Sequence, residues 1–399
     1  MKYVVRTLGC KANLYDSQLM EATLREMGME PAGEGETADV CVVNSCTVTN
    51  EAEKQSRDAA RRLAKTHPGT RVVMTGCSVE VDPQALAKVA GVDYVLSNRD
   101  KPRFGALLGA ALSGPTSGQV DPSAPVADIL GDARGYEQLL SKHPMDREWP
   151  LPEALSFLSS EDRREDSHMS SAARTRVFLK IQEGCDSFCT FCIIPYGRGP
   201  GRSLRVGDLV GQVERLCAAG AREVVLTGTN IGQYGMDWSE DKSLRLEELC
   251  RALLERTSIE RLRVSSLDPV EITPGLLGLM ESDPRFCPHF HVSLQSPHPK
   301  ILRLMKRKYG AAEVRSALES IAGLRTNPAP FVGMDVITGF PGETREEFEW
   351  GLGVLDSLPW SRLHVFPYSE RKGTPATRLP GSVERGERLR RAEALRALS

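Results

Sequence analysis

The stretch Glu183-Gly184-Cys185-Asp186-Ser187-Phe188-Cys189-Thr190-Phe191-Cys192 places three cysteines within a single short segment. It directly follows an apolar run at 177–181 that is predicted to be a strand, so it should form a strand-to-helix loop. Three thiolates this close together can bind three corners of an iron–sulfur cluster and leave the fourth iron open. A structural zinc site needs four ligands, usually as two pairs, and no second pair or nearby histidine follows Cys192. The stretch therefore predicts an iron–sulfur site with one iron available for chemistry.

The region after residue 176 contains six β-branched runs separated by helical patterns. They lie at 177–181, 223–227, 261–265, 289–294, 332–337 and 363–366. Repeated strand–helix units of this kind predict a partial or complete parallel barrel, and an open doubly wound sheet is the alternative. In both architectures ligands bind at the carboxyl ends of the strands. The cysteine loop lies at such an end.

The first hundred or so residues also alternate between strand and helix. Strands are predicted at 3–6, 40–44, 71–75 and 94–96, and helices at 17–27, 51–66 and 83–90. This alternation predicts a parallel sheet with helices on its faces. The following region is rich in proline, serine, glycine and acids, which predicts a linker or insertion with one short helix near 136–141. We expect an N-terminal domain at 1–112, this linker at 113–172, a second α/β domain at 173–372 and a basic segment at 373–399.

A second set of cysteines follows the N-terminal strands. Cys10, Cys46 and Cys77 each stand at a predicted strand end, and Gly9 and Gly76 precede two of them. Because the ends of parallel strands meet at one edge of a sheet, these three thiols could form a second site. The alternative is that cysteine is simply common at buried strand ends. The remaining cysteines are expected to be small core residues: Cys41, Cys217, Cys250 and Cys287.

Composition narrows the class of protein. The chain has 399 residues, ten cysteines and a formal net charge of −2. No apolar run is long enough to cross a membrane, and no signal peptide is apparent, so we expect a cytoplasmic protein without membrane contact. In the cytosol clustered cysteines usually indicate metal binding or catalysis. Basic runs at 300–308 and 371–396 indicate either solvated helix faces or a surface that attracts phosphates.

The motif C-D-S-F-C-T-F-C at 185–192 resembles the signature of the radical S-adenosylmethionine (SAM) superfamily. The resemblance implies that the open iron chelates the amino and carboxylate groups of SAM, and that cleavage of SAM yields a 5′-deoxyadenosyl radical. Phe191 matches the aromatic residue that the superfamily places against the adenine.

The two cysteine sets together resemble the methylthiotransferase family of radical SAM enzymes. The resemblance extends along the chain through T-L-G-C-K-A-N (7–13), N-S-C-T-V-T-N (44–50), T-G-C (75–77), L-T-G-T-N-I-G (226–232), S-S-L-D-P (265–269), H-V-S-L-Q-S (291–296), D-V-I-T-G-F-P-G-E-T (335–344) and F-P-Y-S-E-R-K-G-T-P (366–375). It implies a flavodoxin-like N-terminal domain followed by a partial (β/α)6 barrel. It also implies two 4Fe-4S clusters, held by Cys10, Cys46, Cys77 and by Cys185, Cys189, Cys192. The second cluster would handle sulfur during insertion of a methylthio group at a C–H carbon.

The N-terminal motifs look most like the branch that acts on threonylcarbamoyladenosine beside the tRNA anticodon. Alternatives are the isopentenyladenosine branch, the branch acting on an aspartate of a ribosomal protein, and, more remotely, a zinc-bearing RNA-binding protein. The implied partners are a tRNA anticodon loop, a sulfur donor and a reductant such as flavodoxin or ferredoxin. Residues expected to contact SAM or the nucleotide are Phe191, Gly228, Asn230, Ser266, Gln295 and Gly339.

Three features depart from the family pattern. Asp268 stands where glutamate is more usual, and P-H-P at 297–299 replaces a usual G-S-D. The family normally continues into a small RNA-binding β-barrel, whereas this sequence is expected to offer only its basic C-terminal segment.

Overall fold

The computed structural model describes residues 1–113, 176–238 and 243–399. The linker expected at 113–172, with its short helix at 136–141, therefore lies outside the described residues except for Ser113. The chain divides into two compact units. The first comprises Met1–Ala173 and Ile193–Pro200, and the second comprises Arg174–Cys192 and Gly201–Ser399. The eight residues that directly follow the cysteine loop thus pack with the N-terminal unit.

The N-terminal unit is built on a five-stranded, wholly parallel sheet of order β2-β1-β3-β4-β5. This is the strand order of flavodoxin-like folds. The strands are β1 (Lys2–Thr7), β2 (Glu30–Pro31), β3 (Val40–Ser45), β4 (Arg71–Gly76) and β5 (Tyr94–Val95). The four strands predicted from β-branched runs are present, whereas β2 was not predicted because a two-residue Glu-Pro segment shows no strand pattern.

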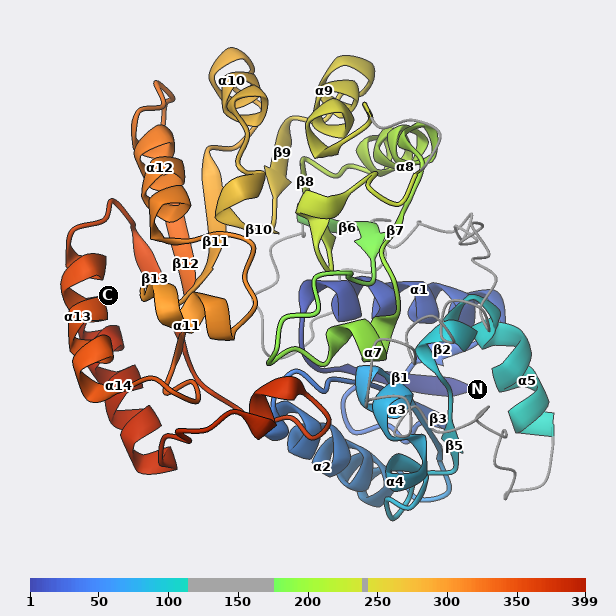
Figure 1. Ribbon diagram of the computed structural model, residues 1–399. Helices are drawn as coiled ribbons and strands as arrows, with labels where there is room; N and C mark the ends of the chain where they lie inside the picture. Colours follow the sequence, from blue (N-terminus) through green and yellow to red (C-terminus); the bar gives the residue numbers. More distant parts are fainter. Residues whose placement is uncertain (114–175, 239–242) are drawn as a thin grey trace. The chain divides into compact units, whose positions relative to one another are not determined.

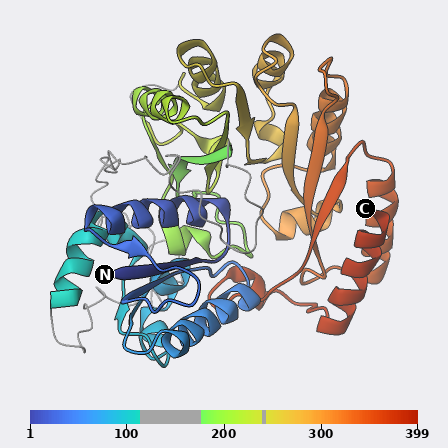
Figure 2. The ribbon, with the colours of Figure 1, turned by 180° about the vertical axis from the view of Figure 1, so that it is seen from behind.

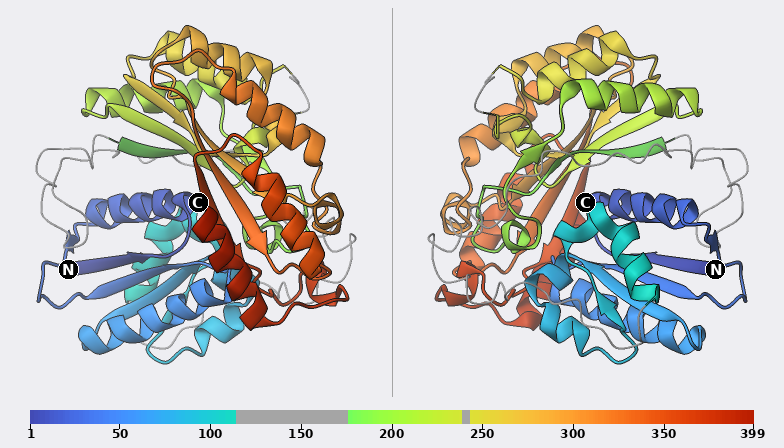
Figure 3. Two further views of the ribbon diagram at one scale, coloured as in Figure 1. Left: turned by 90° about the vertical axis from the view of Figure 1, so that its left-hand side faces the viewer. Right: turned by 90° about the vertical axis from the view of Figure 1, so that its right-hand side faces the viewer.

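The helices of this unit cover both faces of its sheet (Figure 3). They are α1 (Lys11–Glu26), α2 (Asn50–Thr66), α3 (Cys77–Val81), α4 (Pro83–Ala87), η1 (Asn98–Arg103), α5 (Phe104–Ser113) and α7 (Ile194–Arg198). Side chains alternate across β3: Val40 and Val42 pack with α1 and α5, whereas Cys41 and Val43 pack with α2 and α4. This alternation follows from the two-residue period of a strand. Cys41 is a core residue, as predicted.

The second unit is a curled, mainly parallel sheet with its helices along one side (Figures 1 and 2). Its strands are β6 (Arg176–Glu183), β7 (Arg202–Ser203), β8 (Glu223–Gly228), β9 (Arg261–Val264), β10 (Ser266–Leu267), β11 (His289–Gln295), β12 (Phe331–Thr338) and β13 (Arg362–Pro367). They form two four-stranded sheets, β7-β6-β8-β9 and β10-β11-β12-β13. Only Ser265 separates β9 from β10, so the two sheets follow one another at this bend. The six predicted strands correspond to β6, β8, β9, β11, β12 and β13, and the partial (β/α)6 barrel is confirmed.

The helical elements of the second unit alternate with these strands. They are α8 (Val206–Ala218), η4 (Ile231–Gln233), α9 (Leu246–Arg256), η5 (Pro269–Glu271), α10 (Pro274–Ser282), α11 (Pro299–Leu304), α12 (Ala311–Ala322), α13 (Arg345–Asp356), η6 (Pro375–Arg378) and α14 (Arg385–Leu398). Cys250 and Cys287 are buried, and Cys217 is half-buried, which fits their expected role as small packing residues. Among the described residues, no helix is both long and apolar enough to span a membrane.

Candidate functional site

The three N-terminal cysteines lie at the carboxyl ends of β1, β3 and β4, which are neighbours in the sheet. Cys10 precedes α1, Cys46 follows β3 and Cys77 begins α3. An ideal Cβ on Gly9 would lie 2.6 Å from the Cys46 sulfur, and the hydroxyl of Ser78 donates to the carbonyl of Cys46 at 2.6 Å. The structure therefore brings together the strand ends that carry these cysteines.

Glycine makes this close approach possible. Gly9 and Gly76 have φ values of 95° and 100°, a region that L side chains rarely adopt. A Cβ on Gly76 would also lie 2.6 Å from the backbone nitrogen of Ser45. A Cβ on Gly197, at the end of α7, would lie 3.3 Å from the Cβ of Cys77. Glycines thus let the backbone pass close to Cys46 and Cys77 and let the ends of β3 and β4 approach each other.

The three thiols differ in their environment. Cys46 and Cys77 are buried, whereas Cys10 is exposed. Burial raises the pKa of the Cys46 thiol to about 11, and the neighbouring Cys77 and Cys10 act in the same direction. A bound metal centre would reverse this preference because thiolates are the ligating form. Three thiols at one sheet edge, one of them exposed to solvent, are a suitable set of ligands for an iron–sulfur cluster.

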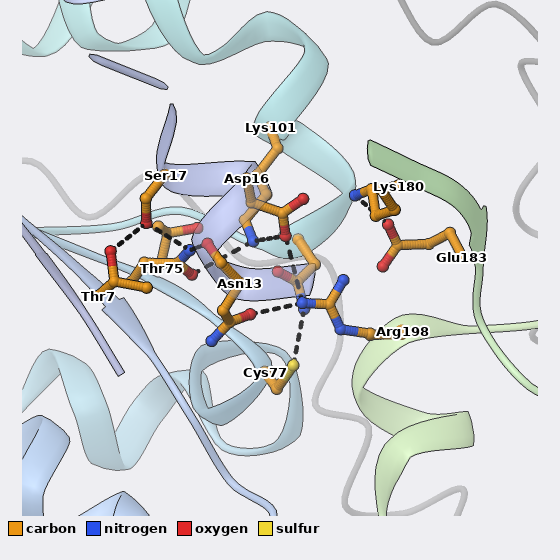
Figure 4. Close-up of polar contacts among 12 residues, drawn as sticks. Thr7, Asn13, Asp16, Ser17, Thr75, Cys77, Lys101, Lys180, Glu183 and Arg198 are labelled. Atoms are coloured by element: carbon orange, nitrogen blue, oxygen red, sulfur yellow. Dashed lines mark hydrogen bonds and ion pairs between the residues drawn. The ribbon is translucent and has the colours of Figure 1, made fainter. Parts of the chain in front are cut away.

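A buried group of charges adjoins these cysteines (Figure 4). The carboxylate of Asp16 in α1 binds the Lys101 ammonium at 2.7 Å and the Arg198 guanidinium at 3.2 Å. Arg198 also donates to the side-chain oxygen of Asn13, whose own amide donates to the backbone carbonyls of Leu8 and Ser45. The arginine is therefore linked to the two segments that lead into Cys10 and Cys46.

In the second unit, the cysteine loop is held by the elements around it. The backbone nitrogen and hydroxyl of Thr190 donate to the carbonyls of Met305 and Leu304, and the amide of Asn230 reaches the Cys185 sulfur at 3.8 Å. Phe188 has a φ of 46°, which is uncommon for a residue other than glycine. A backbone held in such a conformation often indicates a functional loop.

Arg307 is a central polar residue of this site that sequence reasoning saw only as part of a basic run. Its guanidinium is buried and donates to the Cys189 sulfur at 2.9 Å and to the carboxylate of Asp268. Burial raises the pKa of the Cys189 thiol, and the positive charge of Arg307 opposes that rise. The arginine thus places a positive charge beside one of the three predicted ligands.

Glu271 is a second titratable group close to the loop that sequence reasoning missed. Burial, together with the nearby Asp268 carboxylate, raises the pKa of Glu271 to about 7. Its carboxylate accepts from the backbone nitrogen of Asp268 at 2.8 Å. An ideal Cβ on Gly232 would lie 2.6 Å from a Glu271 oxygen, so a larger residue there would require the carboxylate to move.

The predicted SAM-contacting residues occupy different surroundings. Phe191 packs against an apolar cluster that includes Phe340, whose ring lies 6.3 Å away edge-on. Asn230 lies beside Cys185, and the Gly228 backbone approaches Gln182 so closely that a Cβ would lie 2.6 Å from its carbonyl oxygen.

The other three candidates belong to strand ends farther along the sheet. Ser266 begins β10 and is exposed, whereas Gln295 ends β11 with a φ of 64°. Gly339 follows β12, and its backbone nitrogen donates to the Glu343 carboxylate at 2.6 Å. Gly339 also packs against Arg388, where a Cβ would lie 3.1 Å from the Cβ of that arginine. Its small size is therefore already needed by the fold.

Across residues 1–113, 176–238 and 243–399, no three Cys, His, Asp or Glu side chains surround a single metal-ion position.

Comparison with known proteins agrees with this geometry. Residues 2–97 match the model of the uncharacterized protein family UPF0004, and residues 179–350 match that of the radical SAM superfamily. The solved radical S-adenosylmethionine methyltransferase TsrM from Kitasatospora setae superposes with a TM-score of 0.60 at 14% identity. That match covers 94% of this chain and 74% of TsrM, and at this identity it shows the fold. The fold and the cysteine loop thus define a radical SAM enzyme.

Curated relatives define the family more narrowly. The threonylcarbamoyladenosine tRNA methylthiotransferase MtaB of Aquifex aeolicus is 36% identical, with 100% of this chain and 88% of the relative covered. The protein of the same name from Rickettsia prowazekii is 34% identical, with 99% and 82% covered. The chain belongs to the methylthiotransferase family of radical SAM enzymes, and within that family it resembles the MtaB branch.

Proposed function

We propose that this enzyme adds a methylthio group to carbon 2 of threonylcarbamoyladenosine beside the anticodon of tRNA. The observation that carries the proposal is the placement of Cys10, Cys46 and Cys77 at adjacent strand ends, in addition to the cysteine loop of the second unit. Two relatives that bear the name of this activity match nearly the whole chain. The proposal assigns one 4Fe-4S cluster to each cysteine set.

The cofactors would supply the difficult chemistry. When bound, the loop cluster and SAM would supply the radical that removes hydrogen from the adenine. Sulfur attached to the N-terminal cluster, with a methyl group from a second SAM, would complete the methylthio group. The chain's own residues bind and orient these groups. Cys185, Cys189 and Cys192 would hold the loop cluster and leave its fourth iron for SAM. Arg307 holds a positive charge against Cys189, and Phe191 offers an aromatic face for adenine.

The proposed SAM and nucleotide contacts follow the strand ends. Asn230 is the best supported, because its amide already lies beside Cys185. Gly228 lets its loop approach the first strand of the barrel. Ser266, Gln295 and Gly339 are proposed at the neighbouring strand ends, where parallel sheets bind their ligands.

The basic runs support RNA binding only in part. Arg388 and Arg391 in α14 are buried and pair with Glu370 and Glu343, so they stabilise the fold. Basic residues that remain exposed in these runs are Arg303, Lys306, Lys308, Lys372, Arg378, Arg385, Arg390 and Arg396. Arg390 already pairs with Glu387, and Arg396 donates to the carbonyl of Val365. The other six side chains can attract phosphates. A single-stranded anticodon loop can present its base to the site without melting of a duplex.

The proposed function can be tested with purified, anaerobically reconstituted enzyme. With dithionite as reductant, the natural sequence should cleave SAM and convert tRNA that carries threonylcarbamoyladenosine. Cys185→Ala should abolish SAM cleavage, whereas Cys10→Ala should retain cleavage and lose the methylthio product. In cells the electrons would come from a reductant such as flavodoxin or ferredoxin, and a sulfur donor would be required.

Mass spectrometry separates the alternatives. Bulk tRNA from a deletion strain should lack 2-methylthio-threonylcarbamoyladenosine and retain 2-methylthio-isopentenyladenosine. Loss of the isopentenyl product instead would assign the sister branch, and unchanged tRNA with an unmodified ribosomal protein aspartate would assign the third branch. Protein that binds zinc and takes up no iron would contradict all three.

A further inference from the structure

The charge group beside the N-terminal cysteines contains two cations and one anion. The side chains of Lys101, Arg198 and Asp16 are 5%, 2% and 1% exposed. Buried cations are unfavourable unless opposite charge lies nearby. Asp16 supplies such a charge, and the buried Glu80 carboxylate, which pairs with Arg99, also interacts with Lys101. Burial indeed lowers the pKa of Lys101, and the Asp16 carboxylate opposes that effect.

The two cations lie next to Cys46 and Cys77. Arg198 interacts electrostatically with Cys46, and Lys101 interacts with Cys77. The amide of Asn98, at the start of η1, donates to the Cys77 sulfur at 3.7 Å and to the carbonyl of Gly197 at 2.6 Å. The helix that carries Arg198 is thus fixed against the helix that begins at Cys77.

An iron–sulfur cluster at this site would have the complementary charge. A [4Fe-4S]2+ core bound by three thiolates has a net charge of −1, and its reduced form has one more negative charge. Net charge and hydrogen bonds around a cluster set its reduction potential. A positive charge fixed nearby favours the reduced, more negative form.

We infer that Arg198 and Lys101, restrained by Asp16, form a built-in counter-charge that sets the reduction potential of the N-terminal cluster. They are positioning residues that act through the cluster. The inference rests on the proposed second cluster and adds what determines its electron affinity. A purely structural ion triad is the competing explanation, and it predicts no ordered change in potential.

The sign of the charge change separates the two explanations. Arg198→Gln and Lys101→Met each remove one positive charge, so the cluster should become harder to reduce. Asp16→Asn removes the negative charge, so the cluster should become easier to reduce. Arg198→Lys keeps the charge and should stay close to the parent. The exposed Arg103, on the same 3-10 helix as Lys101, offers a matched control in Arg103→Gln.

The experiment uses the full chain with the three loop cysteines replaced by alanine, so that only the N-terminal cluster can form. Each variant is reconstituted anaerobically with iron and sulfide, its iron content is measured, and its midpoint potential is determined by an EPR-monitored redox titration. Opposite shifts for Arg198→Gln and Asp16→Asn, with no shift for Arg103→Gln, support the inference. Shifts of the same sign, or no shift in either, overturn it.

Folding and cluster formation are scored separately. If Arg198→Gln does not fold by circular dichroism, Lys101→Met gives the same predicted sign and decides the matter. If the parent takes up no iron, the proposed second cluster fails and the inference fails with it. If the parent forms the cluster and the charge substitutions leave its midpoint potential unchanged, only the inference fails.

Discussion

Replacing Glu271 by glutamine should make the second unit more stable at alkaline pH. The pKa of this carboxyl is raised to about 7, mainly by burial, so the folded protein binds a proton that the unfolded chain releases near pH 4.5. The stability associated with the protonated form is fully present below pH 4.5 and is lost as the pH rises through about 7. Glutamine is uncharged at every pH and avoids this loss.

The size of the effect follows from the shift. A rise from 4.5 to about 7 corresponds to about 3 kcal/mol once both states are ionised. Between pH 5 and pH 8, and allowing for the partial exposure of the side chain, we expect Glu271→Gln to gain about 2 kcal/mol relative to glutamate. The gain should be small at pH 5.

Urea unfolding at pH 5 and pH 8, followed by tryptophan fluorescence, measures this difference. The described tryptophans all lie in the second unit: Trp238, Trp350 and Trp360. Glu313→Gln is the control, because backbone hydrogen bonds lower the pKa of that exposed carboxyl and its replacement should not stabilise at pH 8. If Glu271→Gln is equally stable relative to glutamate at both pH values, the raised pKa is refuted.

Two further substitutions test the packing around the sites. Gly76→Ala should destabilise the N-terminal unit by about 3 kcal/mol, because Gly76 has a positive φ and its Cβ would collide with β3. Gly69 also has a positive φ but open space around it, so Gly69→Ala should cost only about 1 kcal/mol. Thermal unfolding compares the two variants. Arg391→Met should cost about 3 to 5 kcal/mol because it leaves the buried Glu343 unpaired, whereas the exposed Arg390→Met should change stability by less than about 0.5 kcal/mol. Equal effects within either pair would contradict the geometry.

The fold was largely predictable because most of its strands coincide with short β-branched runs. Short β-branched runs such as 40–44 and 332–337 can be buried only as strands of a covered parallel sheet, and their alternation with helices determines the layers. The start of α1 was placed six residues too late, at Ser17 instead of Lys11, because its first turn is polar and shows no apolar period. The two-residue strand β2 is stabilised by pairing with β1, which local sequence does not reveal.

The site was predictable only where chemistry and strand ends coincide. The cysteines could be named because few side chains bind metals and because parallel strand ends converge. Arg198 could not be predicted as a site residue, because it binds the carboxylate of Asp16, which lies 182 positions earlier in the chain. In the sequence Arg307 is one member of a basic run. Only the structure shows that its side chain is buried and pairs with Asp268. Charges that fold inward look the same in sequence as charges that face water.

The assignment of Ile193–Pro200 to the N-terminal unit limits how the chain can be divided. A cut between 173 and 174 would leave this segment on the wrong fragment, separated from Asp16 and carrying a guanidinium without its carboxylate. The two units are therefore not exchangeable modules, although each has its own sheet. Any recombination of this enzyme with a relative would have to transfer the eight residues together with α1.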